Sequence, residues 1–232
     1  MESKSIKPIS IILGIMAIYY VLYSCFYCYN NIHVAITTDY NDFVFPSSTV
    51  SIILTLIGFA WYLLLMIWFL IVSGGTKKKA FGVMAVIALS LHLLVTAGNL
   101  FYQLYLHSAD LYVLTTYYTA IDALNGIGSL LLGIAFIIMG RHLPEKTRKW
   151  SIAIGICILV LLVFWILHSF INSYISCPNT PQDHVRNTYL TNALFDILTM
   201  VKFVFMAIFF FLCSKRDQQH SASITGDREV TQ

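Results

Sequence analysis

Three charged side chains lie inside long apolar segments, and they are the residues of this sequence best suited to chemistry. Asp122 falls in segment 111–139, and Asp196 and Lys202 fall in segment 188–213. A charge at hydrocarbon depth costs about 2.5–3.5 kcal/mol even on a lenient scale, so each needs a partner or water. Buried carboxylates are usual components of proton relays and ion pathways. We therefore interpret Asp122 and Asp196 as proton or cation sites and Lys202 as their counter-ion.

Lys202 is expected to pair with a carboxylate on another helix. It lies about 120° round the helix from Asp196, which makes an ion pair within one helix poor. Counted from the ends of the segments, Lys202 matches the depth of His92, and Asp122 lies a turn or two shallower. An interhelical Lys202–Asp122 pair is the predicted arrangement, and a purely structural role for that pair is the alternative.

A polar stripe crosses the third apolar segment. Its members recur at helical spacing and so share one helix face: His92, Thr96, Asn99 and Gln103. Together with Asn125 of the next segment, His92, Asn99 and Gln103 would line a path for an ion or a small polar solute. The alternative is interhelical hydrogen bonding, which is worth about 0.6 kcal/mol per contact on average.

Glycines repeat every seven residues in the fourth segment, at Gly126, Gly133 and Gly140. Small residues on one stripe allow two helices to approach closely. Asp122 precedes Gly126 by one turn and falls on the same stripe. The pattern therefore predicts a close helix contact that Asp122 also faces.

Cys25 and Cys28 form a Cys-x-x-Cys motif near the end of the first segment. In such a motif the first thiolate attacks a substrate disulfide, and the second thiol resolves the mixed disulfide. Cys177, in a later loop, could exchange with them or form a structural disulfide with Cys28. A membrane thiol oxidoreductase is therefore an alternative function, although cysteine also occurs in apolar helices simply as a small hydrophobic residue.

Six long apolar segments must position all of these residues. They span roughly 8–29, 48–73, 80–106, 111–139, 150–176 and 188–213, and about 20 residues suffice to cross a bilayer as a helix. The chain is 58% hydrophobic and 11% charged, whereas soluble domains are about 25% charged. The sequence predicts an all-α membrane protein, with a six-helix transmembrane domain over residues 1–214 and a disordered tail over 215–232.

Basic residues set the expected orientation. Outside the apolar segments, every Lys and Arg except Arg186 falls on one side of the six segments. Because cytoplasmic loops carry the excess of basic residues, we expect both termini in the cytoplasm. The net charge of +3 is thus explained by the basic residues of the cytoplasmic loops, and it gives no reason to expect a nucleic-acid partner. A multi-pass membrane location follows, without an indication of which membrane.

The remaining patterns predict no catalytic centre, no metal cluster and no cofactor. A haem between His92 and His168 is disfavoured because their depths differ by roughly 9 Å at 1.5 Å per residue. Tyrosines near the end of the first segment are interpreted as headgroup-level anchors, and nothing in the second segment suggests chemistry. The predicted function is a transporter or channel for an ion or small polar solute, with the bilayer and that solute as partners. A receptor or assembly factor without catalysis is a further alternative, and a homo-oligomer is compatible with the sequence.

Overall fold

The computed structural model describes residues 3–37, 48–74, 79–106, 111–174 and 181–229, and these residues form helices and short connections. The helices are α1 (Ser3–Thr37), α2 (Ser48–Gly74), α3 (Ala80–Phe101), α4 (Leu111–Gly140), α5 (Glu145–Tyr174) and α6 (Pro181–Glu229). A short π-helical turn, η2 (Tyr102–Leu106), continues α3. In the described ranges, six helices are long and apolar enough to cross a membrane, over 24 to 32 residues each. The prediction of an all-α chain with six candidate membrane spans is confirmed.

Two helices run well past the apolar segments that predicted them. α1 continues to Thr37 because its polar last turns are packed: Asn30, Asn31, Val34 and Ala35 are buried. α6 continues to Glu229 and so includes most of residues 215–232, the segment predicted to be a disordered tail. Both predicted segments end where polar residues begin. Polar side chains alone do not end a helix, however, as long as its backbone N–H and C=O groups remain hydrogen-bonded to one another.

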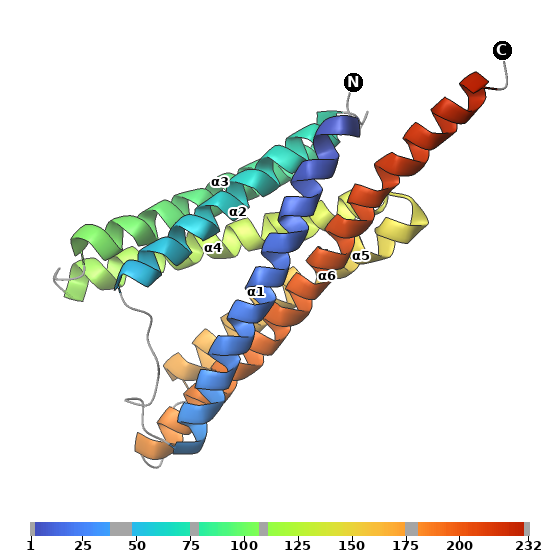
Figure 1. Ribbon diagram of the computed structural model, residues 1–232. Helices are drawn as coiled ribbons and strands as arrows, with labels where there is room; N and C mark the ends of the chain where they lie inside the picture. Colours follow the sequence, from blue (N-terminus) through green and yellow to red (C-terminus); the bar gives the residue numbers. More distant parts are fainter. Residues whose placement is uncertain (1–2, 38–47, 75–78, 107–110, 175–180, 230–232) are drawn as a thin grey trace.

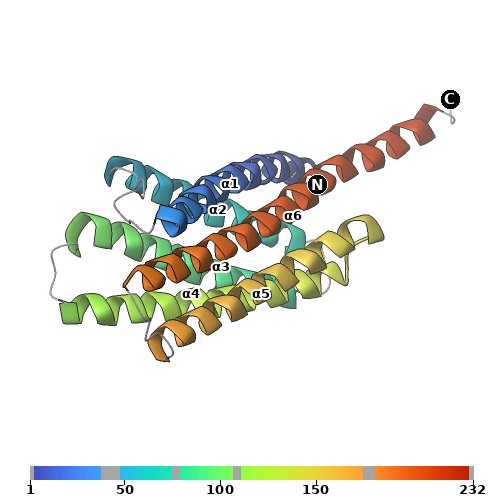
Figure 2. The ribbon, with the colours of Figure 1, turned by 90° about the horizontal axis from the view of Figure 1, so that it is seen from below.

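The six helices form a ring in chain order, and α6 closes the ring against α1. The contact is most extensive between α1 and α6 and sparsest between α1 and α2. α1 begins and α6 ends at the same end of the bundle, which we call the terminal end (Figure 1). Towards the opposite, distal end, α2, α3 and α4 diverge from α1, α5 and α6 (Figure 1). Seen from below, α6 lies between α1 and α5 (Figure 2).

Aromatic side chains fill the terminal half of the bundle. Five nearly inaccessible side chains make this terminal core: Trp68, Phe69, Phe136, Phe209 and Phe210. Their ring centroids lie 5.1 to 6.2 Å apart, mostly edge to face, the arrangement that aromatic pairs prefer. The Trp68 indole N–H donates to the Ser10 hydroxyl at 2.9 Å. α1, α2, α4 and α6 are therefore joined here without a gap.

The predicted glycine contact joins α4 to α5. A Cβ on Gly140 would lie 2.7 Å from Ile152, and one on Gly133 would lie 2.9 Å from Leu159, whereas at Gly126 the nearest atom is 3.8 Å away. The prediction that this stripe faces a neighbouring helix is confirmed. The two helices separate towards the distal end, however, and Asp122, one turn beyond Gly126, is exposed. The expectation that Asp122 also faces that helix is wrong for this reason.

Candidate functional site

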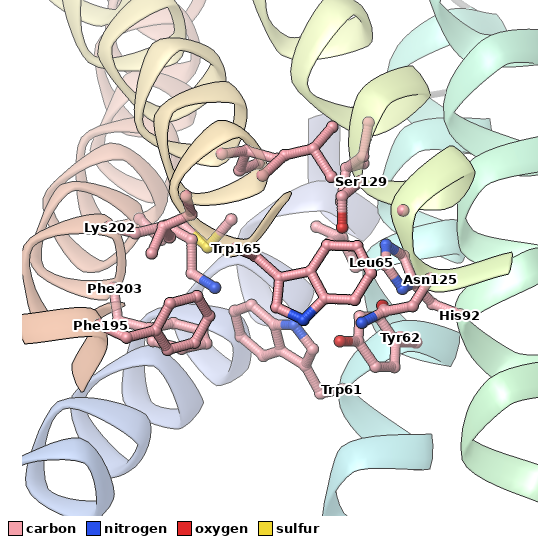
Figure 3. Close-up of a pocket in the computed structure, with 16 residues that line it drawn as sticks. Trp61, Tyr62, Leu65, His92, Asn125, Ser129, Trp165, Phe195, Lys202 and Phe203 are labelled. Atoms are coloured by element: carbon pink, nitrogen blue, oxygen red, sulfur yellow. The ribbon is translucent and has the colours of Figure 1, made fainter. Parts of the chain in front are cut away.

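A cavity of about 180 Å³ lies in the middle of the bundle, lined by α2, α3, α4, α5 and α6 (Figure 3). We call it the central cavity. Its polar lining residues are His92, Asn125, Ser129 and Lys202, and its aromatic ones are Trp61, Tyr62, Trp165, Phe195 and Phe203. Ligand sites typically combine an apolar, aromatic lining with a few convergent polar groups. The central cavity has this composition, with lining residues from five of the helices.

Among the described residues that line the central cavity, Lys202 is the one that carries a formal charge. Figure 3 shows its side chain projecting from α6 into the cavity, with Nζ 4.3 Å from the centroid of the Phe203 ring. Such a cation–π contact is worth about 0.5–2 kcal/mol, against about 2.5–3.5 kcal/mol for holding the charge at this depth. The ring alone does not offset that cost, so the ammonium needs a further partner.

His92 is held firmly on the wall opposite Lys202 in this view (Figure 3). Its ring stacks on Tyr62, with centroids 4.8 Å apart and planes 10° from parallel. A Cβ on Gly128 would lie 3.2 Å from His92 Nε2, so α4 approaches the ring through a residue without a side chain. Asn125 hydrogen-bonds to the His92 side chain. Contacts from the two neighbouring helices, α2 and α4, thus fix this imidazole of α3.

A second cavity, of about 450 Å³, lies on the distal side of the first, and we call it the distal groove. It is lined by four tyrosines of α1 and by polar residues of α2 and α3: Tyr19, Tyr20, Tyr23, Tyr27, Ser51, Thr55, Asn99 and Gln103. The Gln103 amide donates to Ser51 Oγ at 3.0 Å. The groove follows the sparse contact between α1 and α2, so the ring of helices is loosest where this polar surface lies.

Three rings separate the two cavities, and we call them the aromatic layer. Tyr20 stacks on Phe203 at 4.7 Å, and Trp61 meets both edge-on at 5.5 and 5.8 Å. Trp61 and Phe203 line both cavities. The layer is contributed by α1, α2 and α6, so a change in the α1–α2 contact would move it. The aromatic layer therefore lies where the distal groove and the central cavity adjoin.

The residues predicted to form a pathway divide into three groups. His92, Asn125 and Lys202 line the central cavity, Asn99 and Gln103 line the distal groove, and Asp122 and Asp196 line neither. Asp122 is exposed on α4. Asp196 accepts a hydrogen bond from Asn31 Nδ2 at 2.7 Å, between α6 and α1.

The expected Lys202–Asp122 ion pair is absent, although both residues lie in the described part of the chain. Lys202 points into the central cavity (Figure 3). Asp122 is exposed on α4, in the part of that helix that no longer packs closely against α5. Depth along the helix predicted this pair, but depth says nothing about which way each side chain faces.

Protein families, curated proteins and solved structures give no match to this chain. The function is therefore argued from the cavities and their side chains. Within the described ranges, no three residues of the kinds that bind metals come together.

The cysteine motif lies on α1 against α6. The Cys25 thiol donates to Met200 Sδ at 3.0 Å, and the Cys28 thiol donates to the Ala193 carbonyl at 3.7 Å. The two thiols are not bonded to each other. Cys177 lies outside the described residues, so its predicted exchange or pairing with Cys28 stays a prediction.

Sequence reasoning missed the rings that shape the site. Trp61 and Tyr62 of α2 line both cavities, and four α1 tyrosines line the distal groove. A signal was present: Tyr19, Tyr23 and Tyr27 recur every fourth residue, which puts them on one helix face. A belt of headgroup anchors need not be one-sided, so this spacing favours an inward-facing row.

Proposed function

We propose that this chain is an integral membrane carrier for a small polar or charged solute that binds in the central cavity. The observation that carries the proposal is the order of layers from the distal to the terminal end. The distal groove comes first and the aromatic layer follows it. The central cavity, with its one charged side chain, comes next, and the buried terminal core comes last. Transporters commonly bind their solute near the membrane midplane, between parts of the bundle that move against each other.

A carrier fits this order of layers better than an open channel. A channel requires a continuous polar path, whereas here the terminal core fills the next layer with nearly inaccessible rings. On the distal side, Tyr20, Trp61 and Phe203 pack together between the two cavities, and Tyr20 and Trp61 come from α1 and α2, the neighbouring helices with the sparsest contact. We therefore describe this conformation as one that opens first towards the distal end.

Thiol accessibility tests the proposal without knowledge of the solute. In a variant whose five cysteines are replaced by serine, Ser129→Cys places a thiol in the central cavity and Met139→Cys places one in the buried terminal half. A small membrane-impermeant thiol reagent is added separately to each face of sealed vesicles. The carrier predicts that Ser129→Cys reacts from the distal face and that Met139→Cys does not react. It also predicts that a transported solute slows the Ser129→Cys reaction.

The outcomes separate the three functions raised by the sequence. If Ser129→Cys reacts from neither face, the cavity is sealed, the carrier is wrong, and a receptor or assembly factor becomes the better proposal. If solute flux into proteoliposomes is lost when Cys25 and Cys28 alone become serine, the thiols act in the reaction and the oxidoreductase is favoured. The carrier predicts that this double variant keeps its flux.

A further inference from the structure

We propose that the solute is a small monoanion, a monocarboxylate with one aromatic ring or a short apolar chain, whose anionic group pairs with Lys202. This inference rests on the proposed function, because it names the class of solute for the same cavity. It differs from the cation or proton sites that the sequence suggested. The argument starts from the charges that line the cavity.

The central cavity attracts anions. Its lining contains the Lys202 ammonium, and the lining residues within the described ranges include no carboxylate to neutralise it. The two carboxylates predicted to lie nearby are engaged elsewhere: Asp196 with Asn31, and Asp122 on the exposed face of α4. Hydrogen-bond donors also line the cavity, on Asn125, Ser129 and the Trp165 indole. A solute with one negative charge would complete this set.

The aromatic lining does not reverse this conclusion. Cages of aromatic rings often bind cations, and Trp61, Trp165, Phe195 and Phe203 would suit one. Here the chain's own ammonium already occupies such a position, 4.3 Å from the Phe203 centroid. A second cation would be repelled by Lys202 at short range in a medium of low dielectric constant. The rings are then free to pack against the apolar body of an anion.

The volume limits the size of the solute. About 180 Å³ is slightly more than the roughly 150 Å³ of an engineered cavity that holds benzene. One ring, or a chain of comparable volume, together with a carboxylate therefore fills the space. On the wall opposite Lys202, His92 and Asn125 offer hydrogen bonds to a second polar group (Figure 3). A hydroxyl on the far side of the ring would increase affinity.

Binding of three matched probes tests the class of solute. Benzoate, benzamide and benzylammonium share one ring and differ in charge. Their binding to the purified full-length protein in lipid nanodiscs is measured by calorimetry and by quenching of tryptophan fluorescence. We expect saturable binding of benzoate, with benzamide and benzylammonium at least about 30-fold weaker, as for loss of one partner of a buried charge pair. Equal or tighter binding of benzylammonium would overturn the proposal, and this result needs no variant.

Variants assign the effect to Lys202. Lys202→Met should weaken benzoate binding by about 30-fold or more, and Lys202→Arg should restore most of it because the charge is kept. Lys79→Met, which removes an exposed charge at the start of α3, is the matched control and should bind benzoate like the parent chain. Unchanged benzoate affinity in Lys202→Met would contradict the proposal.

Flux measurements separate failure of the solute class from failure of the carrier. If benzamide or benzylammonium, but not benzoate, enters proteoliposomes through the protein, the class of solute is wrong and the carrier stands. If benzoate binds through Lys202 and is never transported, the anion site stands and the chain is a binding protein.

Discussion

The two halves of the bundle are built from the same kinds of side chain and differ in what those side chains contact. In the terminal half, the rings of Trp68, Phe136 and Phe209 touch one another and are nearly inaccessible. In the distal half, Tyr19, Tyr23 and Tyr27 line a groove of about 450 Å³. Aromatic content is therefore a poor guide to function in this chain, and the packing of the rings is a better one.

The comparison assigns different tasks to the two halves. Helix association in a bilayer depends on packing and interhelical hydrogen bonds, because lipid tails are as apolar as leucine. The terminal half supplies both, through its ring core and the Trp68–Ser10 hydrogen bond. The distal half leaves α1 and α2 in sparse contact, and the proposed carrier would change shape there while the terminal half stays packed.

Truncation of one aromatic residue in each half gives the largest expected contrast. Trp68→Ala should lower the free energy of unfolding by about 3–5 kcal/mol, as is usual for a fully buried large ring. Tyr23→Ala, which removes a ring from the groove wall, should lower it by about 1 kcal/mol or less. Denaturant titration in mixed micelles measures both. Equal losses would mean that the two halves do not differ in packing.

The glycine contact between α4 and α5, which we call the seam, gives a smaller contrast. Here two Gly→Ala substitutions should change the free energy of unfolding in opposite directions. A Cβ at Gly155 would lie 2.6 Å from the Gly133 carbonyl oxygen, a backbone atom that cannot move aside. Gly155→Ala should therefore destabilise the bundle by about 1–3 kcal/mol. At Gly126 the nearest atoms are 3.8 Å away, so Gly126→Ala should stabilise it by about 0.4–1 kcal/mol. Melting temperatures of the two variants test the widening of the seam, and destabilisation by both would contradict it.

The smallest expected effect concerns the hydrogen bond between α1 and α6 in the distal half. Asn31 Nδ2 and Asp196 Oδ2 are 2.7 Å apart. A double-mutant cycle with Asn31→Leu and Asp196→Leu should give a coupling energy of about 0.6–1.7 kcal/mol, the range measured in membrane helices. Benzoate binding should survive Asp196→Leu, because Asp196 does not line the central cavity. Loss of benzoate binding in Asp196→Leu would mean that Asp196 contributes to the central cavity site.

The sequence predicted the helices well because membrane spans and helix contacts leave local signals. Apolar segments located all six candidate spans, and the seven-residue spacing of Gly126, Gly133 and Gly140 located the α4–α5 seam. The polar ends of α1 and α6 were not anticipated. Their helicity depends on contacts with other helices, or on backbone pairing that hydropathy does not measure.

The candidate site was predictable in part. The helical spacing of the polar stripe predicted that His92 faces inward. Lys202 was identified because it is a charged residue in an apolar helix, and both residues line the central cavity. The partner of Lys202 could not be predicted, because the separation of α4 from α5 beyond Gly126, which leaves Asp122 exposed, has no local signal in the sequence. Trp61 and Tyr62 carry no sequence signal that distinguishes a cavity wall from a packed core, since both require the same residue types.

The stability of Lys202→Met tests the central claim most directly, namely that this charge serves a solute and not the fold. In the described part of the chain, the cation–π contact with Phe203 offsets only part of the cost of holding this charge inside the bundle. Replacement of Lys202 by an apolar residue of similar length should therefore raise the free energy of unfolding by about 1–3 kcal/mol. The same variant should lose benzoate binding. A fall of about 3–5 kcal/mol, as when one partner of a buried ion pair is removed, would show that Lys202 is a structural residue and contradict this account.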